Sequence, residues 1–249
     1  MWTTWIIYGM VHYERRGAAA LVTIDRPDRR NAVDGPTAAA LLEAYKRFAA
    51  DDDAHVLVLA GAGGTFCAGA DLKALETLDP DAPAGPMGFT RLEPAKPAIA
   101  AVGGWCVAGG LELALWCDLR VAAAGARFGC LERRWGVPLL DGGTQRLPRV
   151  VGLGRALDLI LTGRVVEAPE ALAMGLVTEV VEDGREVERA LQLAEAIAAF
   201  PALTMLSDRE AAHAALGLPL AEGLELEARL GRERIRDALD GARRFADRA

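Results

Sequence analysis

The sequence predicts an α/β fold with a largely parallel sheet, followed by a helical C-terminal region. Short apolar or β-branched segments alternate with segments of helical periodicity through most of the chain. Such alternation implies crossover connections, which place neighbouring strands parallel. Residues 55–60 form a continuous apolar run of the kind that is buried on both faces of a parallel sheet. After Gly184 the strand-like segments cease.

Each predicted strand is short and bounded by Gly, Pro or charged residues. The predicted strands cover residues 19–25, 55–60, 98–102, 118–122, 126–129 and 177–181. The predicted helices between them carry apolar side chains at helical spacing. One helix opens at Gly35-Pro36, and the others cover residues 71–75, 109–117, 143–150, 155–161 and 169–174. Five prolines between residues 79 and 97 predict an irregular loop.

We place a soft boundary near residue 184, between a strand-bearing region over residues 11–184 and a helical region over residues 185–249. The helices predicted in the second region end at Phe200, cover residues 202–216, and run from Leu220 toward Phe245. Residues 222–248 mix seven Arg with seven acidic residues. This pattern fits either a solvated helix face or an arm that packs against another subunit.

The composition is that of a globular protein with a substantial core, since 52% of the residues are hydrophobic and 25% are charged. The net charge of −7 argues against a general nucleic-acid binder, which carries a basic excess. No stretch approaches the apolar length of a membrane span, about 20 residues. Residues 1–10 lack the basic start and cleavage site of a signal peptide, so we expect a mis-assigned start or a frayed extension.

The cysteines and histidines form no metal-binding pattern. No CxxC pair occurs among the four cysteines (Cys67, Cys106, Cys117 and Cys130), and the three histidines are scattered, so we expect no zinc site. Four unpatterned cysteines are typical of reduced thiols, which predicts a cytoplasmic protein. Cys67 lies in a Gly-rich loop, where it is either a reactive thiol or, as we favour, a buried small side chain.

Two Gly-rich loops each follow a predicted buried strand and precede a helix. The first, residues 61–71, has Phe66 where a dinucleotide-binding GxGxxG fingerprint needs its third glycine, which excludes that site. The second, residues 103–110, opens the helix that contains Glu112. Helix starts offer unpaired N–H groups, so two such loops side by side would supply one N–H each to a developing oxyanion. The alternative is that both loops are structural turns.

Glu112 and Glu132 are the candidate acid–base residues. Glu112 lies among leucines, where a carboxylate is costly to bury without a partner or a task. Desolvation would raise its pKa toward the range that is useful for proton transfer. Glu132 precedes Arg133 and Arg134, so its alternative role is a surface ion pair. Two carboxylates near one oxyanion site suit proton transfer to and from water.

Several motifs occur in a specific order along the chain. They are Phe-Cys-Ala-Gly-Ala-Asp-Leu-Lys at 66–73, Lys-Pro-Ala-Ile-Ala-Ala-Val at 96–102, Ala-Gly-Gly-Leu-Glu-Leu-Ala at 108–114, Cys117-Asp118, and Gly-Gly-Thr-Gln-Arg-Leu-Pro at 142–148. Together they resemble the enoyl-CoA hydratase/isomerase (crotonase) family over roughly residues 11–182. The resemblance implies a repeated ββα superhelix. It makes residues 11–184 the acyl-CoA-binding catalytic core and residues 185–249 a helical region used in oligomerisation.

The resemblance also implies roles for individual residues. Ala70 and Gly109 match the backbone positions of the oxyanion hole for the thioester carbonyl. Glu112 and Glu132 match the glutamates that hold and activate water. The positions implied to line the acyl-CoA groove are Ala68, Ala70, Asp71, Leu72 and Lys73. Arg29 and Arg30 are natural contacts for coenzyme A phosphates, although a solvated loop is the alternative.

Leu140 and Asp141 depart from the family pattern, in which the turn before Thr144 is smaller and uncharged. We place both residues in the substrate pocket. Asp141 is either a third acidic group there or, as we favour, the cap of the helix that begins near Gly142.

The implied activity is addition of water across the 2,3 double bond of an enoyl-CoA thioester. The alternatives are a double-bond isomerase, another lyase or a thioesterase that uses the same oxyanion hole, or a non-catalytic acyl-CoA or RNA-binding protein. We expect no cofactor beyond coenzyme A as part of the substrate, no nucleic-acid or membrane partner, and a role in fatty acid and lipid metabolism. Relatives in this family assemble as homotrimers or dimers of trimers, which we also expect here.

Overall fold

The computed structural model describes residues 5–247 and divides into two compact units between Glu195 and Ala196. The first unit contains all the strands and the predicted site residues. Helix α6 (Glu186–Ala198) follows the soft boundary near residue 184, and its residues up to Glu195 belong to the first unit.

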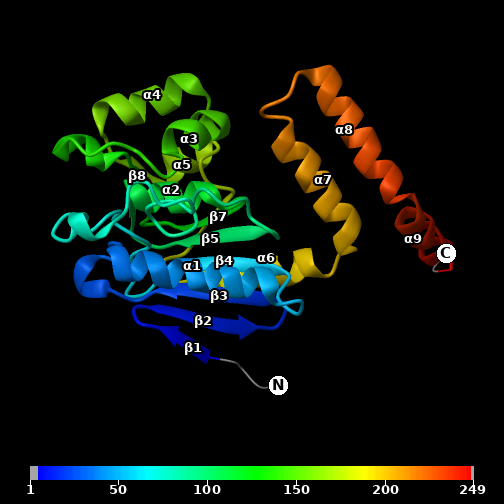
Figure 1. The fold of residues 1–249 in the computed structure, drawn as a ribbon, viewed down its shortest axis with the longest axis horizontal. Helices are drawn as coiled ribbons and strands as arrows, with labels where there is room; N and C mark the ends of the chain where they lie inside the picture. Colours follow the sequence, from blue (N-terminus) through cyan, green and yellow to red (C-terminus); the bar gives the residue numbers. More distant parts are fainter. Residues whose placement is uncertain (1–4, 248–249) are drawn as a thin grey trace. The chain divides into compact units, whose positions relative to one another are not determined.

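A seven-stranded sheet organises the first unit, in the order β1-β2-β3-β4-β5-β7-β10. Figure 1 labels all of these strands except β10. Its strands are β1 (Trp5–Tyr8), β2 (Val11–Arg16), β3 (Ala19–Ile24), β4 (Val56–Gly61), β5 (Ala98–Val102), β7 (Leu119–Ala123) and β10 (Glu179–Val181). The pairs from β3 through β10 are parallel, which confirms the predicted largely parallel sheet. The register places Leu59 opposite both Val22 and Ala100, so the central strands share one apolar core.

The antiparallel edge of this sheet was not predicted. β1 pairs with β2, and β2 pairs with β3, both antiparallel. Residues 5–8 therefore belong to the sheet, and the expectation of a frayed extension is wrong for them; residues 1–4 lie outside the described part of the chain. The charged residues of β2 hide its strand character in the sequence. Two of them, Glu14 and Arg16, form an ion pair at 2.9 Å on this edge of the sheet.

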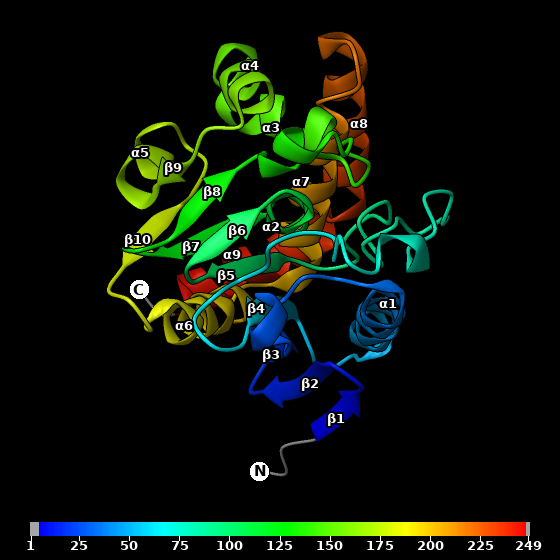
Figure 2. The ribbon, with the colours of Figure 1, turned by 90° about the vertical axis from the view of Figure 1, so that its left-hand side faces the viewer.

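A smaller sheet carries some of the loops that build the site. It consists of β6 (Trp105–Val107), β8 (Arg127–Gly129) and β9 (Val166–Glu167), in the order β6-β8-β9. Figure 2 shows it on the side of β5 and β7, away from β1 and β2. The sequence predicted a turn where β6 lies, because this strand is short and starts directly after two glycines.

Helices cover the large sheet, and Figure 2 shows α1 and α6 on either side of β4. The helical elements before α6 are η1 (Pro27–Arg29), α1 (Gly35–Ala50), η2 (Leu75–Thr77), α2 (Gly109–Trp116), η3 (Leu131–Trp135), α3 (Gly143–Val151), α4 (Leu153–Thr162) and α5 (Ala168–Ala173). The Asp34 side chain caps α1 by accepting from Thr37 N at 3.0 Å. At its other end Lys96 Nζ donates to the carbonyls of Phe48, Asp51 and Ala54, which fixes α1 beside the sheet.

The helix predicted over residues 71–75 is wrong. Asp71 N donates to Val33 O at 2.8 Å, and Asp71 Oδ1 accepts from Lys73 N at 3.1 Å. A short acidic side chain that bonds the backbone two residues on favours a turn over a helix. The helical turn forms only afterwards, in η2.

The second unit is helical throughout the part that the structure describes. It contains α7 (Ala202–Ala214), α8 (Leu220–Glu233) and α9 (Ile235–Ala246). The single helix predicted from Leu220 toward Phe245 is broken at Arg234, whose ψ of 7° leaves the helical range. Within residues 5–247 no single helix has both the length and the apolar character of a membrane span, and α6 and α7 meet that test only as a bent pair.

Candidate active site

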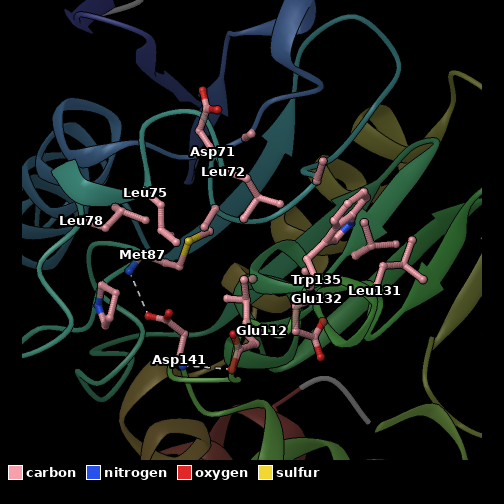
Figure 3. Close-up of a pocket in the computed structure, with 18 of the residues that line it drawn as sticks. Asp71, Leu72, Leu75, Leu78, Met87, Glu112, Leu131, Glu132, Trp135 and Asp141 are labelled. Atoms are coloured by element: carbon pink, nitrogen blue, oxygen red, sulfur yellow. Dashed lines mark hydrogen bonds between the residues drawn. The ribbon is translucent and has the colours of Figure 1, made fainter. Parts of the chain in front are cut away.

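A cavity of about 820 Å³ lies in the first unit, where loops from both sheets converge (Figure 3). Its walls come from the segment after β3, the loop between β4 and β5, the start of α2, and the chain from η3 to α3. All twelve residues predicted for the site line it: Arg29, Arg30, Ala68, Ala70, Asp71, Leu72, Lys73, Gly109, Glu112, Glu132, Leu140 and Asp141. The fold thus brings them together, and their individual roles stay predictions.

The two Gly-rich loops run side by side. Cys67 N donates to Trp105 O at 2.9 Å, and Val107 N donates to Cys67 O at 3.1 Å. Gly69 has a φ of 94°, and a Cβ at this position would lie 2.9 Å from Gly109 N. Only glycine therefore allows the first loop to adopt this conformation and approach the start of α2 so closely.

Two backbone N–H groups meet at this contact. Gly69 O accepts from Val33 N, and Asp71 N donates to Val33 O, both at 2.8 Å. Because successive N–H groups of an extended backbone alternate in direction, the Ala70 N–H points away from Val33. Within residues 5–247 the N–H groups of Ala70 and Gly109 donate no hydrogen bond. Both are free to bind an oxygen atom, which is the arrangement of an oxyanion hole.

The residue before Gly109 adopts a strained backbone conformation. Ala108 has φ 53° and ψ −130°, outside the regions that side-chain-bearing residues ordinarily adopt. Its N–H donates to Gly129 O at 2.9 Å, and its carbonyl accepts from Glu112 N at 3.2 Å. These bonds hold the strained turn, which aims the first N–H of α2 at the cavity.

Glu112 lies in the first turn of α2 and is buried. Its Oε1 accepts hydrogen bonds from Asp141 N at 2.9 Å and Gly143 N at 2.7 Å. Desolvation by burial and, to a smaller extent, the negative charge of Asp141 raise the pKa of Glu112 to about 7. The side chain can therefore exchange a proton near neutral pH, and the two N–H donors fix its orientation.

Glu132 lies in η3 and points into the same part of the cavity (Figure 3). Both of its carboxylate oxygens are sealed from solvent and accept no hydrogen bond within the described residues. Burial raises its pKa. The alternative of a surface ion pair is wrong, because Arg133 donates to Ile160 O at 3.3 Å and Arg134 donates to Gly163 O at 2.9 Å.

Asp141 is a third carboxyl group in the cavity, and the favoured interpretation as a helix cap is wrong. The N-cap of α3 is Gly142, and no side chain caps this helix. Asp141 Oδ1 instead accepts from Met87 N at 2.9 Å (Figure 3). It also accepts from Thr90 Oγ1. Desolvation raises the pKa of Asp141. Its carboxyl group points toward the Pro-rich loop because two donors there compete successfully with the N–H groups of the first turn of α3.

The arginine loop forms one rim of the cavity. Arg29 and Arg30 are exposed and line it, beside Lys73 from the opposite segment. Asp71 is buried and pairs with Arg26 at 3.2 Å. The three exposed cationic side chains suit the phosphates of a nucleotide-bearing substrate, while Asp71 is occupied in holding the loop.

Several residues of the site carry no signal in the sequence. Asn31 is buried and its side chain donates to Ala62 O and Thr65 O, at 2.9 and 2.6 Å, which ties the first Gly-rich loop to η1. Met87 and Trp135 line the cavity from a loop and from η3. Trp135 is 73% exposed, and the sequence pattern around it did not indicate that it lines a cavity.

The four cysteines are buried free thiols. Burial raises the pKa of Cys67 to about 12, which leaves a negligible thiolate fraction at neutral pH. The favoured interpretation of Cys67 as a buried small side chain is confirmed. Within residues 5–247 no group of three or more His, Cys, Asp or Glu side chains is arranged to hold a metal ion.

The chain is similar to known proteins over almost its whole length. A family model described as enoyl-CoA hydratase/isomerase matches residues 14–249. A probable enoyl-CoA hydratase of Rhizobium meliloti is 42% identical over 227 residues, 90% of this chain and 88% of that protein. An enoyl-CoA hydratase of Mycobacterium tuberculosis is 37% identical over 246 residues, 94% of this chain and 92% of the relative. The crystal structure of an enoyl-CoA hydratase of Mycobacterium marinum superposes with a TM-score of 0.91 at 37% identity, covering 96% of each chain.

Proposed function

The chain belongs to the enoyl-CoA hydratase/isomerase family, and we propose that it adds water across the 2,3 double bond of an enoyl-CoA thioester. The predicted fold class is confirmed by the similarity to solved hydratases. One observation carries the proposal beyond the family. Two backbone N–H groups that have no acceptor among residues 5–247 open into the same cavity as two buried glutamates with raised pKa values.

The oxyanion hole supplies the first part of the proposed mechanism. The thioester carbonyl oxygen accepts hydrogen bonds from the N–H groups of Ala70 and Gly109. When a nucleophile attacks the β-carbon, the π electrons move toward this oxygen and the thioester becomes enolate-like. Fixed N–H donors at that oxygen stabilise the developing charge more than they stabilise the ground state.

The two glutamates divide the proton transfers. Glu112 acts as the base, because two N–H bonds to its Oε1 favour the ionised form. It takes a proton from water as the water oxygen bonds to the β-carbon. Glu132 accepts no hydrogen bond from the part of the chain that the structure describes, so protonation relieves a buried charge. It donates this proton to the α-carbon. One water molecule is consumed. Glu112 ends the reaction protonated and Glu132 ends it ionised, and proton exchange with solvent restores both groups to their starting states.

A panel of short, long, branched and aromatic enoyl-CoA thioesters tests the proposal. We expect loss of the absorbance of the conjugated thioester and formation of the 3-hydroxyacyl product with at least one member. If no absorbance is lost while the α-hydrogens still exchange with solvent deuterium, the chain is an isomerase and not a hydratase. Acyl-CoA binding without either reaction would leave only a binding protein.

Gly109 offers a direct test of the oxyanion hole. Gly109→Pro removes the N–H at the first position of a helix, where proline is otherwise tolerated. We expect turnover to fall by about two to three decades, the usual cost of losing one oxyanion donor. Gly109→Ala is the matched control. It keeps the N–H, and its Cβ lies 3.0 Å from the flexible end of Met87. Equal losses in both variants, measured with folding checked by circular dichroism, would contradict this role.

The proposal extends to the setting of the enzyme. The N–H groups and carboxyl groups supply the chemistry of hydration, so coenzyme A enters only as part of the substrate. Exposed apolar side chains on α8 and α9, among them Leu224, Leu239 and Phe245, support assembly as a homotrimer or a dimer of trimers. We place the protein in the cytoplasm and in fatty acid metabolism, which the acyl-CoA substrate supports.

A further inference from the structure

Asp141 makes side-chain contacts that neither the oxyanion hole nor the two glutamates require. It lies in the turn between η3 and α3 and is 4% exposed. Its backbone N–H donates to Glu112 Oε1 at 2.9 Å. Its Oδ1 accepts from Met87 N at 2.9 Å and from Thr90 Oγ1. One residue therefore connects the glutamate to the Pro-rich loop (Figure 3).

The Pro-rich loop is held to this turn by two further side chains. Arg146 donates to Asp141 O at 2.9 Å and to Thr90 O at 2.6 Å. Arg91 donates to Leu140 O at 3.2 Å. The two segments are 51 residues apart in the chain at the contact between Thr90 and Asp141. Side chains thus make a connection that no strand pairing provides.

Met87 makes this connection relevant to the substrate. Its Sδ and Cε lie 3.0 Å from the position that a Cβ on Gly109 would occupy, and its side chain lines the cavity. The side chain therefore forms a wall directly beside the oxyanion N–H. An acyl chain whose thioester oxygen binds at Gly109 must pass this wall. The position of Met87 is fixed through its backbone by Asp141.

The charges around Glu112 and Asp141 come from several elements. Glu112 interacts with the charges of Asp141, Glu132 and Arg146. Asp141 interacts with the charges of Arg91 and Arg146. The neighbouring titratable groups are Glu93 and the Cys117 thiol near Arg146, Arg133 near Glu132, and the Cys130 thiol near both glutamates.

We propose that Asp141 is a positioning residue that holds the Met87 wall of the acyl cavity against the turn that orients Glu112. The inference rests on the proposed hydration reaction. Asp141 thereby sets which acyl chains fit beside the oxyanion hole, through its carboxyl group. Through its charge it makes Glu112 harder to ionise, so that the catalytic base titrates closer to neutral pH.

Two substitutions separate these effects. Asp141→Asn keeps an oxygen that can accept from Met87 N and Thr90 Oγ1 but removes the charge. We expect the acidic limb of the pH profile of kcat to move to lower pH by about half a unit or more. Asp141→Ala removes the acceptor as well. We then expect the ratio of KM for the longest accepted chain to KM for a four-carbon chain to change by about fivefold or more, a shift the size of one lost hydrogen bond. In Asp141→Asn this ratio stays within about twofold.

A readout in the free protein keeps the test independent of turnover. We expect the amide hydrogen of Met87 to exchange about tenfold faster in Asp141→Ala than in the unmodified protein, and at an unchanged rate in Asp141→Asn, because the lost bond is local. Asp81→Asn, an exposed carboxylate on the same loop, is the matched control and should change nothing.

Three outcomes overturn the inference. The first is Asp141→Ala with an unchanged KM ratio and an unchanged exchange rate at Met87. The second is Asp141→Asn with turnover lowered by two decades or more at every pH, which makes Asp141 a proton carrier. The third is an acidic limb of the pH profile of kcat that lies at the same pH in Asp141→Asn as in the unmodified protein. If the unmodified protein hydrates no enoyl-CoA, the proposed function fails, and the exchange rate at Met87 still decides whether Asp141 holds the wall.

Discussion

Glu112→Gln is expected to lower the turnover of enoyl-CoA hydration by about two to four decades, the usual contribution of a positioned base. Glutamine keeps an oxygen that can accept from Asp141 N and Gly143 N, so the turn before α3 stays in place. The Kd of a saturated acyl-CoA should therefore change little. Steady-state kinetics and calorimetric binding measure the two effects separately. Glu76→Gln, on exposed η2, is the matched control. Unchanged turnover in Glu112→Gln would remove this residue from the mechanism.

The same variant has an expected effect on stability that does not depend on activity. The pKa of Glu112 is raised from 4.5 to about 7 in the folded protein, so the folded state binds more protons than the unfolded state between these pH values. The free energy of unfolding from this group therefore falls as pH rises through that window, by about 3 kcal/mol. Glu112→Gln should remove this component, so its stability relative to the unmodified protein should be higher at pH 7.5 than at pH 4.5. Urea unfolding at both pH values measures it, and a parallel pH dependence in the two proteins would contradict it.

Replacing Glu132 is expected to raise stability while it lowers activity. Both Glu132 oxygens are sealed from solvent without a hydrogen-bond donor in the described part of the chain, and burial of such a group is costly. Glu132→Met keeps a similar volume and removes both polar atoms. We expect the free energy of unfolding to rise by about 1–3 kcal/mol, and turnover to fall by about two to four decades.

Glu132→Gln separates the two contributions to this result. It keeps the shape of the side chain, removes the proton donor, and leaves polar atoms buried. Its turnover should be as low as that of Glu132→Met, while its stability should rise less. Urea unfolding midpoints at pH 7.5 and single-turnover hydration rates measure both. A loss of stability in Glu132→Met would show that the carboxyl group is well paired in solution, and turnover close to the unmodified rate would show that Glu132 donates no proton.

Prediction from the sequence succeeded where the signal is local. The run of residues 55–60 is apolar because β4 is buried between two parallel neighbours, and the spacing from Gly35 onward follows the buried face of α1. It failed at Asp71, because a backbone bond to Val33 and a side-chain bond to Lys73 stabilise a turn that helical propensity does not show. It also failed at β1, whose strand character depends on pairing with a charged neighbour.

Glu112 and Gly109 are three residues apart on one helix, so the sequence by itself determined that a carboxyl group lies close to the start of that helix. It likewise indicated that the central strands are parallel, because strands that alternate with helices are joined by crossover connections. Only the tertiary structure decided the surroundings of Glu132 and Asp141. Glu132 loses its apparent arginine partners because those side chains bind carbonyls of residues 160 and 163. The Asp141 side chain accepts from Met87 and Thr90 instead of capping the adjacent helix. The sequence around Asp141 could not show this, because these donors lie far away along the chain.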